Sequence, residues 1–247
     1  MVSLLNKFFL KLGYKLQKTP IAYKKSIVVK SEFTTQKALG RMVGHGIEIN
    51  TVIDVGASDG RWSQECMPFF PEAHYLLVEA QVDHLEGLEE FQRTHKNSSF
   101  LLAAAGKENG TIYFDNSELF GGIASEEPFN EDSIKVPVVS LDSEIEKRSL
   151  KAPFLLKLDT HGFEVPILEG AKNVISKANL IIIEAYNFNI EEDSLCFWEL
   201  CDYMWHLGFR PLEVVDLMAR AYDGTFWQMD LFFIKKDHPI FKYIKYR

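Results

Sequence analysis

Cysteine is scarce in this chain of 247 residues, and long apolar runs are lacking. The three cysteines, Cys66, Cys196 and Cys201, form neither a C-x-x-C pair nor a disulfide framework. No apolar run reaches the roughly 20 residues of a membrane-spanning helix. Lysines interrupt the apolar N-terminal stretch, so it lacks the continuous core of a secretory signal. We therefore expect a reduced, cytoplasmic protein.

Positive charge is also in short supply beyond the first 41 residues. The chain has 27 lysine and arginine residues against 35 aspartate and glutamate residues, a net charge of −8. Residues 1–41 hold nine of the basic residues and one acid, Glu32, so this segment carries +8 and the remainder −16. Phosphate binding needs clustered cations, and the acidic main body therefore argues against nucleic acid as a partner.

The basic N-terminus, residues 1–47, is predicted to be a helical extension of the main domain. Its apolar residues recur at helical spacing with lysines between them: Leu4, Leu5, Phe8, Phe9 and Leu12. Three interpretations stay open. The extension caps the active site, it packs on the domain or in a homodimer contact, or it makes peripheral contact with an anionic inner membrane surface.

From about residue 48 the pattern changes to short apolar runs that alternate with amphipathic segments. The runs cover 51–57, 74–80, 98–106, 153–160 and 179–187, and helices are expected at 60–70, 83–96, 164–177 and 192–207. Near-continuously apolar runs are typical of strands buried on both faces, and their alternation with helices predicts a doubly wound, mostly parallel α/β sheet. After 209 the pattern favours an antiparallel hairpin, and an insertion at 107–141 interrupts the alternation. The predicted domain is Rossmann-like and spans 48–247.

Ligands of such sheets bind at the carboxyl ends of the strands, so the residues that end each run are the candidates. The first run ends in D-x-G-x-x-x-G, with Asp54, Gly56 and Gly60, and not in the G-x-G-x-x-G of dinucleotide enzymes. Asp54 and Asp59 would place negative charge where a phosphate should lie. The second run ends at Glu79, whose carboxylate can accept hydrogen bonds from two ribose hydroxyls. S-adenosylmethionine fits both features; the alternative is an ordinary tight turn and a solvated strand end.

The segments VIDVGASDG and LLVEA resemble the cofactor motifs of class I S-adenosylmethionine-dependent methyltransferases. The segments VPVVSLDSEIE, FLLKLDTHGFEVPILEGA, LIIIEAYN and QMDLFFIKK resemble the FkbM family of these enzymes, over about residues 48–236. The resemblance implies O-methylation of a sugar or polyketide hydroxyl, with a small-molecule or glycan acceptor. The family's core block is matched by Lys157, Asp159, Gly162 and Glu164. The cofactor-binding prediction comprises Asp54, Gly56, Ala57, Ser58, Gly60, Glu79, Ala80 and Ala104.

An aliphatic hydroxyl is a poor nucleophile, so its methylation needs a general base or a Lewis acid. Asp159 and His161 end the fourth run, and Lys157 lies two residues earlier on the same strand face, so these three residues are the predicted catalytic group. His161 is the candidate base, or else a turn histidine. A second possibility is Mg²⁺ held by Asp159 and Glu184, with Asn187 as a third ligand.

Glu164 and the loop 120–125 each have a simple structural interpretation beside a functional one. Glu164 either acts at the site or caps the next helix. The glycine-containing loop 120–125 is either a substrate lid or an ordinary long loop. The leading function is an O-methyltransferase, and the alternatives are a non-catalytic S-adenosylmethionine-binding scaffold and a nucleotide-dependent oxidoreductase. Four scattered histidines are expected at the surface: His45, His74, His84 and His95.

Overall fold

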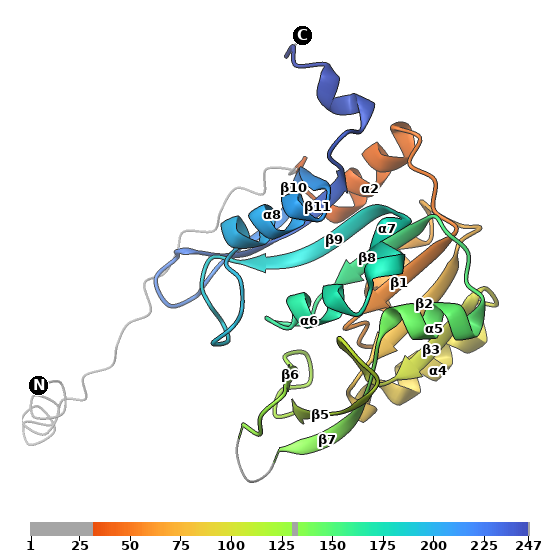
Figure 1. The fold of residues 1–247 in the computed structure, drawn as a ribbon, viewed down its shortest axis with the longest axis vertical. Coiled ribbons are helices and arrows are strands. Elements are labelled where there is room, and N and C mark those ends of the chain that lie inside the picture. Colours follow the sequence, from red (N-terminus) through yellow and green to blue (C-terminus); the bar gives the residue numbers. More distant parts are fainter. Residues whose placement is uncertain (1–31, 130–132, 247) are drawn as a thin grey trace, which may run out of the picture. The chain divides into compact units, whose positions relative to one another are not determined.

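Seven strands form the main sheet of the computed structural model, which describes residues 32–129 and 133–246 (Figure 1). Their order is β10-β11-β9-β8-β1-β2-β3, and all neighbours pair in parallel except β11, which is antiparallel to both β9 and β10. The strands are β1 (Thr51–Val55), β2 (His74–Glu79), β3 (Ser98–Leu102), β8 (Phe154–Leu158), β9 (Ala178–Tyr186), β10 (Phe209–Ala219) and β11 (Phe226–Lys235). The predicted parallel sheet and its C-terminal antiparallel hairpin are confirmed.

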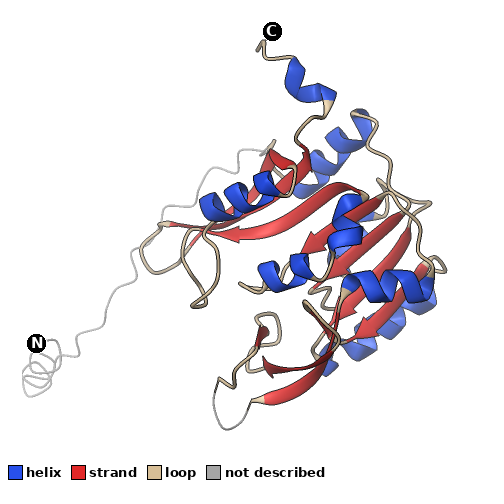
Figure 2. Cartoon of the chain, in the orientation of Figure 1, coloured by secondary structure: helices blue, strands red, loops and turns tan. Residues whose placement is uncertain are grey.

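Helices lie on both faces of this sheet (Figure 2), which makes the fold doubly wound. They are α2 (Thr35–Gly44), α3 (Arg61–Cys66), α4 (Leu85–Thr94), α5 (Leu141–Arg148), α6 (Glu164–Glu169), α7 (Lys172–Ser176) and α8 (Phe197–His206), with 3-10 turns η1 (Val82–His84) and η2 (Pro239–Lys242). The predicted helix at 164–177 is two helices, because the chain breaks at Gly170. A Cβ there would lie 2.1 Å from the backbone oxygen of Gly106.

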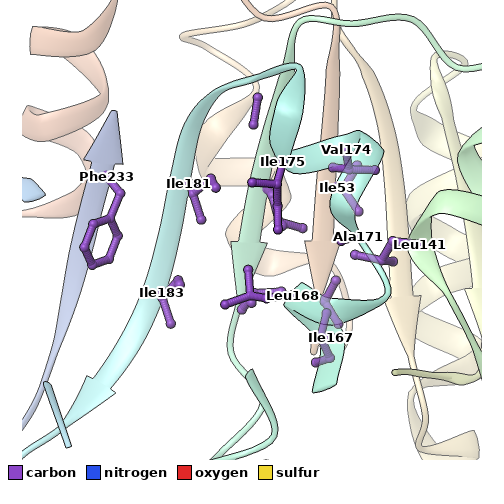
Figure 3. Close-up of a cluster of buried hydrophobic side chains, with 14 of the residues drawn as sticks. Ile53, Leu141, Ile167, Leu168, Ala171, Val174, Ile175, Ile181, Ile183 and Phe233 are labelled. Carbon is purple, nitrogen blue, oxygen red and sulfur yellow. The ribbon is translucent and has the colours of Figure 1, made fainter. Parts of the chain in front are cut away.

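The central strands are apolar almost throughout because both of their faces are buried. Every residue of β1 and β8 is buried, and alternate side chains enter two separate clusters. One cluster packs the sheet against α5, α6, α7 and α8, and Figure 3 shows Ile53, Ile181 and Phe233 within it. The other packs the opposite face against α2, α3 and α4. This double burial fixes the carboxyl ends of β1, β2 and β8 where the ligand site is expected.

The predicted insertion folds as a second, four-stranded sheet in the order β4-β7-β5-β6. Its strands are β4 (Ala104–Ala105), β5 (Gly110–Asp115), β6 (Ile123–Ser125) and β7 (Ile134–Val139), and a small apolar cluster fills one side of it. The run 98–106, predicted as one strand, therefore belongs to two sheets. The chain leaves the first at Ala103, whose N–H bonds to the carbonyl of Glu79, and enters the second at Ala104.

The predicted N-terminal extension, residues 1–47, lies largely outside the described residues. Its described helix, α2, buries Ala38, Leu39 and Met42 in the cluster under β1, and Arg41 forms a forked ion pair with Glu213 of β10 at 2.6 and 2.9 Å. The predicted boundary between 47 and 48 thus does not separate α2 from the sheet. Within the described part of the chain, no helix combines the length and apolar character that crossing a bilayer requires.

Candidate active site

A cavity of about 340 Å³ opens at the carboxyl ends of β1, β2 and β8, a size typical of small-molecule sites. Its floor comes from the loop after β1 and the end of β2. One side comes from β4 and the second sheet, and the other from the loop that follows β8. The predicted residues Gly56, Ala57, Ser58, Glu79, Ala80 and Ala104 line it, as do Lys157, Asp159 and His161. Asp54 and Gly60 do not.

The two glycines of the first loop are required by the packing of the protein itself. Gly56 (φ 73°) lies so close to the next strand that a Cβ would be 1.9 Å from the backbone oxygen of Asp159. Gly60 (φ 85°) begins α3, and a Cβ there would be 2.6 Å from the ring of Phe91. Both positions need a residue that adopts left-handed backbone at little cost. The glycines therefore bring the loop against β8 and α4, and only Gly56 also reaches the cavity.

Glu79 joins the two loops that form the cavity floor. One of its carboxylate oxygens accepts the N–H of Ser58 and the other the N–H of Gln81, each at 2.7 Å. The residue is buried, so the interpretation as a solvated strand end is wrong. A carboxylate oxygen can accept more than one hydrogen bond, so Glu79 retains acceptor capacity for cofactor hydroxyls.

Asp54 lies behind the cavity, fully buried, and burial raises the pKa of its carboxyl. One of its oxygens accepts the hydroxyl of Ser63 at 2.7 Å, and the other lies 3.7 Å from the ammonium of Lys157 without a hydrogen-bond partner. Asp54 thus contacts Lys157 of β8 and Ser63 of α3. It does not line the cavity, where its cofactor contact was predicted.

The three predicted catalytic residues meet at the end of β8. The ammonium of Lys157 donates to Oδ2 of Asp159 at 2.8 Å, and Nε2 of His161 lies 3.4 Å from Oδ1 of the same carboxylate. His161 also lies 3.6 Å from Oε2 of Glu184. The chain turns sharply here, since His161 has φ 50° and Gly162 φ 100°. A cation, a carboxylate and an imidazole are thus held in one row on the cavity wall.

The charges of this row shift the pKa of each member. Burial alone would raise the pKa of Asp159, but Lys157 and His161 hold it well below its usual range. Burial would lower the pKa of Lys157, yet Asp159 and Asp54 keep it above the ordinary lysine value. For His161, burial opposes protonation, and the hydrogen bond and charge of Asp159 outweigh it, so its pKa lies above the usual 6.5. The histidine is therefore a stronger base than free imidazole.

Glu184 has a different environment from Asp159, although both end neighbouring strands. It accepts hydrogen bonds from the hydroxyl of Tyr186 and the side-chain amide of Gln228. Burial, followed by the charge of Asp159, raises the pKa of Glu184 to about 8. Ligand atoms of Asp159, His161 and Glu184 lie within 4.8 Å of one another, so these three are the described residues that can hold a cation. The amide of Asn187, the predicted third ligand, instead donates to the carbonyl of Phe226 at 3.3 Å.

Glu164 begins α6 and is buried. One of its oxygens accepts the N–H of Gly162 at 3.0 Å and the hydroxyl of Thr160 at 3.1 Å. Both groups belong to the turn before α6, whose N-cap residue, Phe163, has no side-chain cap. Glu164 therefore stabilises the tight turn that carries His161.

The glycine-containing loop lies over the cavity, as expected for a lid. Phe120 and Gly122 line the cavity, and the guanidinium of Arg61 lies 4.6 Å from the centre of the Phe120 ring. A Cβ at Gly122 would lie 2.4 Å from the ring of Phe114, so only glycine fits. The loop thus lines the same cavity as the predicted base, His161.

His84 was expected at the surface, and that prediction is wrong. It is buried, lines the cavity, and its Nε2 lies 2.7 Å from the carbonyl of Leu119, the residue before the lid. Gln81 holds the same approach to the lid, since its amide nitrogen donates to the carbonyl of Glu118 at 2.7 Å. Both residues follow the acidic end of β2, the signal that could have marked them. Their partners lie more than thirty residues away in sequence, so no local pattern identified them.

Two buried polar atoms beside the cavity have no partner within the described residues: Nε1 of Trp62 and Oε1 of Gln81. Unpaired buried groups of this kind point to a missing ligand. S-adenosylmethionine has ribose hydroxyls for Glu79, an amino group for an acceptor such as Gln81, and a carboxylate for a donor such as Trp62. The residues present therefore fit this cofactor. A pyrophosphate would need a cation, and among the described residues the floor of the cavity offers only Arg61, which is paired with Asp59 at 2.7 Å.

Comparison with known proteins agrees with this geometry. Residues 54–211 match the methyltransferase FkbM domain. The hexuronic acid methyltransferase AglP of Haloferax volcanii is 22% identical over 175 residues, which cover 70% of this chain and 63% of that protein. The FkbM methyltransferase of Methylobacillus flagellatus KT has a similar fold, with a TM-score of 0.50 and 18% identity, over 74% of this chain and 43% of that one. The chain thus spans less than two thirds of either relative.

The family match covers the loop after β1, the acidic end of β2, the lid and the catalytic row at the end of β8. The matched residues run from the end of β1 to the start of β10 and include the strand ends and loops that line the cavity. The chain belongs to the FkbM family of S-adenosylmethionine-dependent methyltransferases.

Proposed function

We propose that this methyltransferase transfers the methyl group of S-adenosylmethionine to a hydroxyl group of a saccharide or glycoconjugate. The observation that carries the proposal is the Asp159–His161 pair on the cavity wall, because an unactivated hydroxyl needs a base and a nitrogen or thiol acceptor needs less help. The similarity to a hexuronic acid methyltransferase supports a sugar acceptor over a polyketide-like one.

In the proposed reaction the acceptor oxygen bonds to the methyl carbon while the carbon–sulfur bond breaks, and the hydroxyl proton moves to His161. The cofactor supplies an electrophilic methyl group on a positively charged sulfur. Asp159 orients the imidazole and stabilises its protonated form, and Lys157 keeps Asp159 ionised. Glu79 holds the loops that position the cofactor, and the lid covers part of the cavity. Alignment of the two reactants supplies much of the remaining acceleration.

A cation bound by Asp159, His161 and Glu184 is the alternative way to activate the hydroxyl. Mg²⁺ prefers oxygen ligands, and here one of three ligands is an imidazole while Lys157 already neutralises Asp159. Both features favour the base mechanism. Activity that survives EDTA supports it, and activity that EDTA removes and Mg²⁺ restores supports the metal.

Calorimetric titration with S-adenosylhomocysteine, with NADH as the comparison, tests the cofactor half of the proposal. We expect micromolar binding of the first and none of the second. Glu79→Gln should weaken binding about tenfold or more, since hydrogen bonds to a charged group contribute roughly 1.5–3 kcal/mol. Glu89→Gln, on the exposed side of α4, is the matched control and should leave affinity unchanged.

A panel of glycosides, screened by mass for the gain of one methyl group, tests the acceptor half. Transfer to a sugar hydroxyl supports the proposal. Transfer only to amine, thiol or polyketide-like acceptors contradicts it.

A further inference from the structure

Three aromatic side chains lead away from the catalytic row at the ends of β9 and β11. The ring centre of His161 lies 6.4 Å from that of Tyr186, which lies 5.9 Å from Trp227. Trp227 in turn stacks on Phe188, with 5.3 Å between ring centres and 29° between ring planes. We call Tyr186, Trp227 and Phe188 the aromatic row. It begins in contact with the candidate base.

The three buried clusters do not account for the aromatic row. None of its three members belongs to the buried clusters of the described residues or packs against them. The neighbouring Phe226, in contrast, packs on the first cluster and contacts Phe197 at 5.9 Å. Tyr186 is buried, whereas Trp227 and Phe188 are both partly exposed. These outer two rings therefore present aromatic surface to solvent beside the active site.

The backbone holds this surface in place. The N–H of Asn187, between Tyr186 and Phe188, bonds to the carbonyl of Trp227 at 2.8 Å. The hydroxyl of Tyr186 donates to Glu184, which itself lies 3.6 Å from His161. Tyr186 and Glu184 therefore link the aromatic row to His161.

The charge beside the aromatic row is already balanced. The guanidinium of Arg220 lies 4.4 Å from the centre of the Phe188 ring, but two of its nitrogens donate to Asp223 at 2.9 and 2.7 Å. At the other end lie the carboxyl groups of Asp159 and Glu184. An anionic ligand would have to draw Arg220 away from Asp223, whereas a neutral ligand needs no such change.

We propose that the aromatic row binds the ring of an uncharged pyranose, and so places one of its hydroxyls beside His161. This inference rests on the proposed saccharide function and narrows it from sugars in general to neutral sugars, unlike the hexuronic acid named for the relative. The apolar C–H face of a pyranose packs on an aromatic ring, and Trp is the largest such surface. The hydroxyls at the ring edge remain free for Glu184 and His161.

Saturation-transfer NMR tests the assignment on the full-length protein saturated with S-adenosylhomocysteine. The probes are the methyl glycosides of glucose, galactose, mannose and rhamnose, with methyl glucuronide as the charged comparison. We expect at least one neutral glycoside to bind, and to bind about tenfold more weakly to Trp227→Ala, with Phe188→Ala showing a smaller loss. Trp227→Phe should recover most of the affinity, and Trp205→Ala, on an exposed tryptophan of α8, should match the unaltered protein.

The outcomes separate this inference from the proposed function. Unchanged S-adenosylhomocysteine affinity in Trp227→Ala shows that the variant is folded. Binding of no neutral glycoside, equal binding by Trp227→Ala, or preference for methyl glucuronide overturns the assignment. If Trp227→Ala methylates a sugar as well as the unaltered protein, the saccharide function stands and the aromatic row is not its binding site.

Discussion

At the residue scale, His161 has a backbone conformation that few residues adopt readily. Its φ of 50° is left-handed, and such conformations cost free energy in any residue but glycine. The carboxylate of Glu164 accepts the N–H of Gly162 and holds the turn, so the surrounding structure maintains the strain. Strained residues are often found at active sites, and here the strain directs an imidazole at Asp159.

His161→Asn is the sharpest test of the base, because asparagine tolerates left-handed backbone better than most residues. The variant keeps the turn and loses the proton acceptor. We expect methyl transfer to fall by at least about a hundredfold, the usual contribution of general-base catalysis, with S-adenosylhomocysteine affinity unchanged. Single-turnover kinetics measure the loss, and calorimetry serves as the control. A variant that retains a tenth or more of the activity would exclude His161 as the base.

The pH dependence of transfer follows from the same contacts. The base must be deprotonated, so activity should rise as pH passes the pKa of His161, which lies above 6.5 because Asp159 outweighs burial. In Asp159→Asn that hydrogen bond and charge are lost, so the rising limb should move to lower pH while the maximum rate falls. A pH–rate profile of both proteins tests this. A limb that stays in place would mean that another group titrates.

At the element scale, the second sheet and its lid give the cavity a wall that can open. Two bonds close it, from Gln81 to Glu118 and between His84 and Leu119, and Arg61 covers Phe120. Gln81, His84 and Arg61 all lie on the side of the cavity formed by the main sheet. We therefore expect the product to leave, and fresh cofactor to enter, when these few contacts break. The strands beneath should stay packed.

His84→Ala should accelerate dissociation of S-adenosylhomocysteine about fivefold, since a net hydrogen bond contributes about 1 kcal/mol. Amide exchange in residues 116–124 should increase, and exchange in β1 and β8 should not. Stopped-flow release and hydrogen-exchange mass spectrometry measure the two effects. His45→Ala, on an exposed histidine that does not line the cavity, provides the control. Equal exchange in both variants would show that His84 does not hold the lid.

The sequence predicts some of these elements and misses others. Burial on both faces makes β1, β2, β8 and β9 visible as apolar runs, and the acidic strand ends locate the cavity. Helix α5 was missed, because only Leu141 and Ile145 carry its apolar face and its start depends on the Ser140 cap. His84, Trp62 and Gln81 could not be assigned from spacing, since their roles arise from contacts across the cavity. Asp54 does not line the cavity because its side chain contacts Ser63, and no sequence motif indicates that contact.

At the scale of the whole molecule, a rigid sheet and a smaller sheet meet at one site. The main sheet supplies the fixed groups, Glu79 and the row from Lys157 to His161, and the second sheet supplies the cover. The acidic charge of the chain beyond residue 41 agrees with a site that holds a positively charged cofactor and a neutral acceptor. The positive charge of the first 41 residues is not explained by the proposed methyl transfer.

The compact body of the protein begins at Phe33. Residues from Phe33 onward contain both large buried clusters, and α2 is tied to β10 by Arg41–Glu213 and by Thr35, whose hydroxyl donates to Asp216 at 2.6 Å. A chain lacking residues 1–31 should therefore keep its melting temperature within about 4 °C, which corresponds to roughly 1 kcal/mol, and should bind S-adenosylhomocysteine as before.

What that shortened chain loses decides between the three roles of the basic N-terminus. Weaker acceptor turnover indicates a cap on the site, a change of mass in solution indicates a dimer contact, and lost binding to anionic vesicles indicates a membrane surface. Because nine basic residues fall within residues 1–41 and only two of them, Lys37 and Arg41, belong to α2, vesicle binding should weaken with rising salt if the third role holds. A chain that no longer folds would contradict the prediction, since the two buried clusters would then depend on residues outside the body.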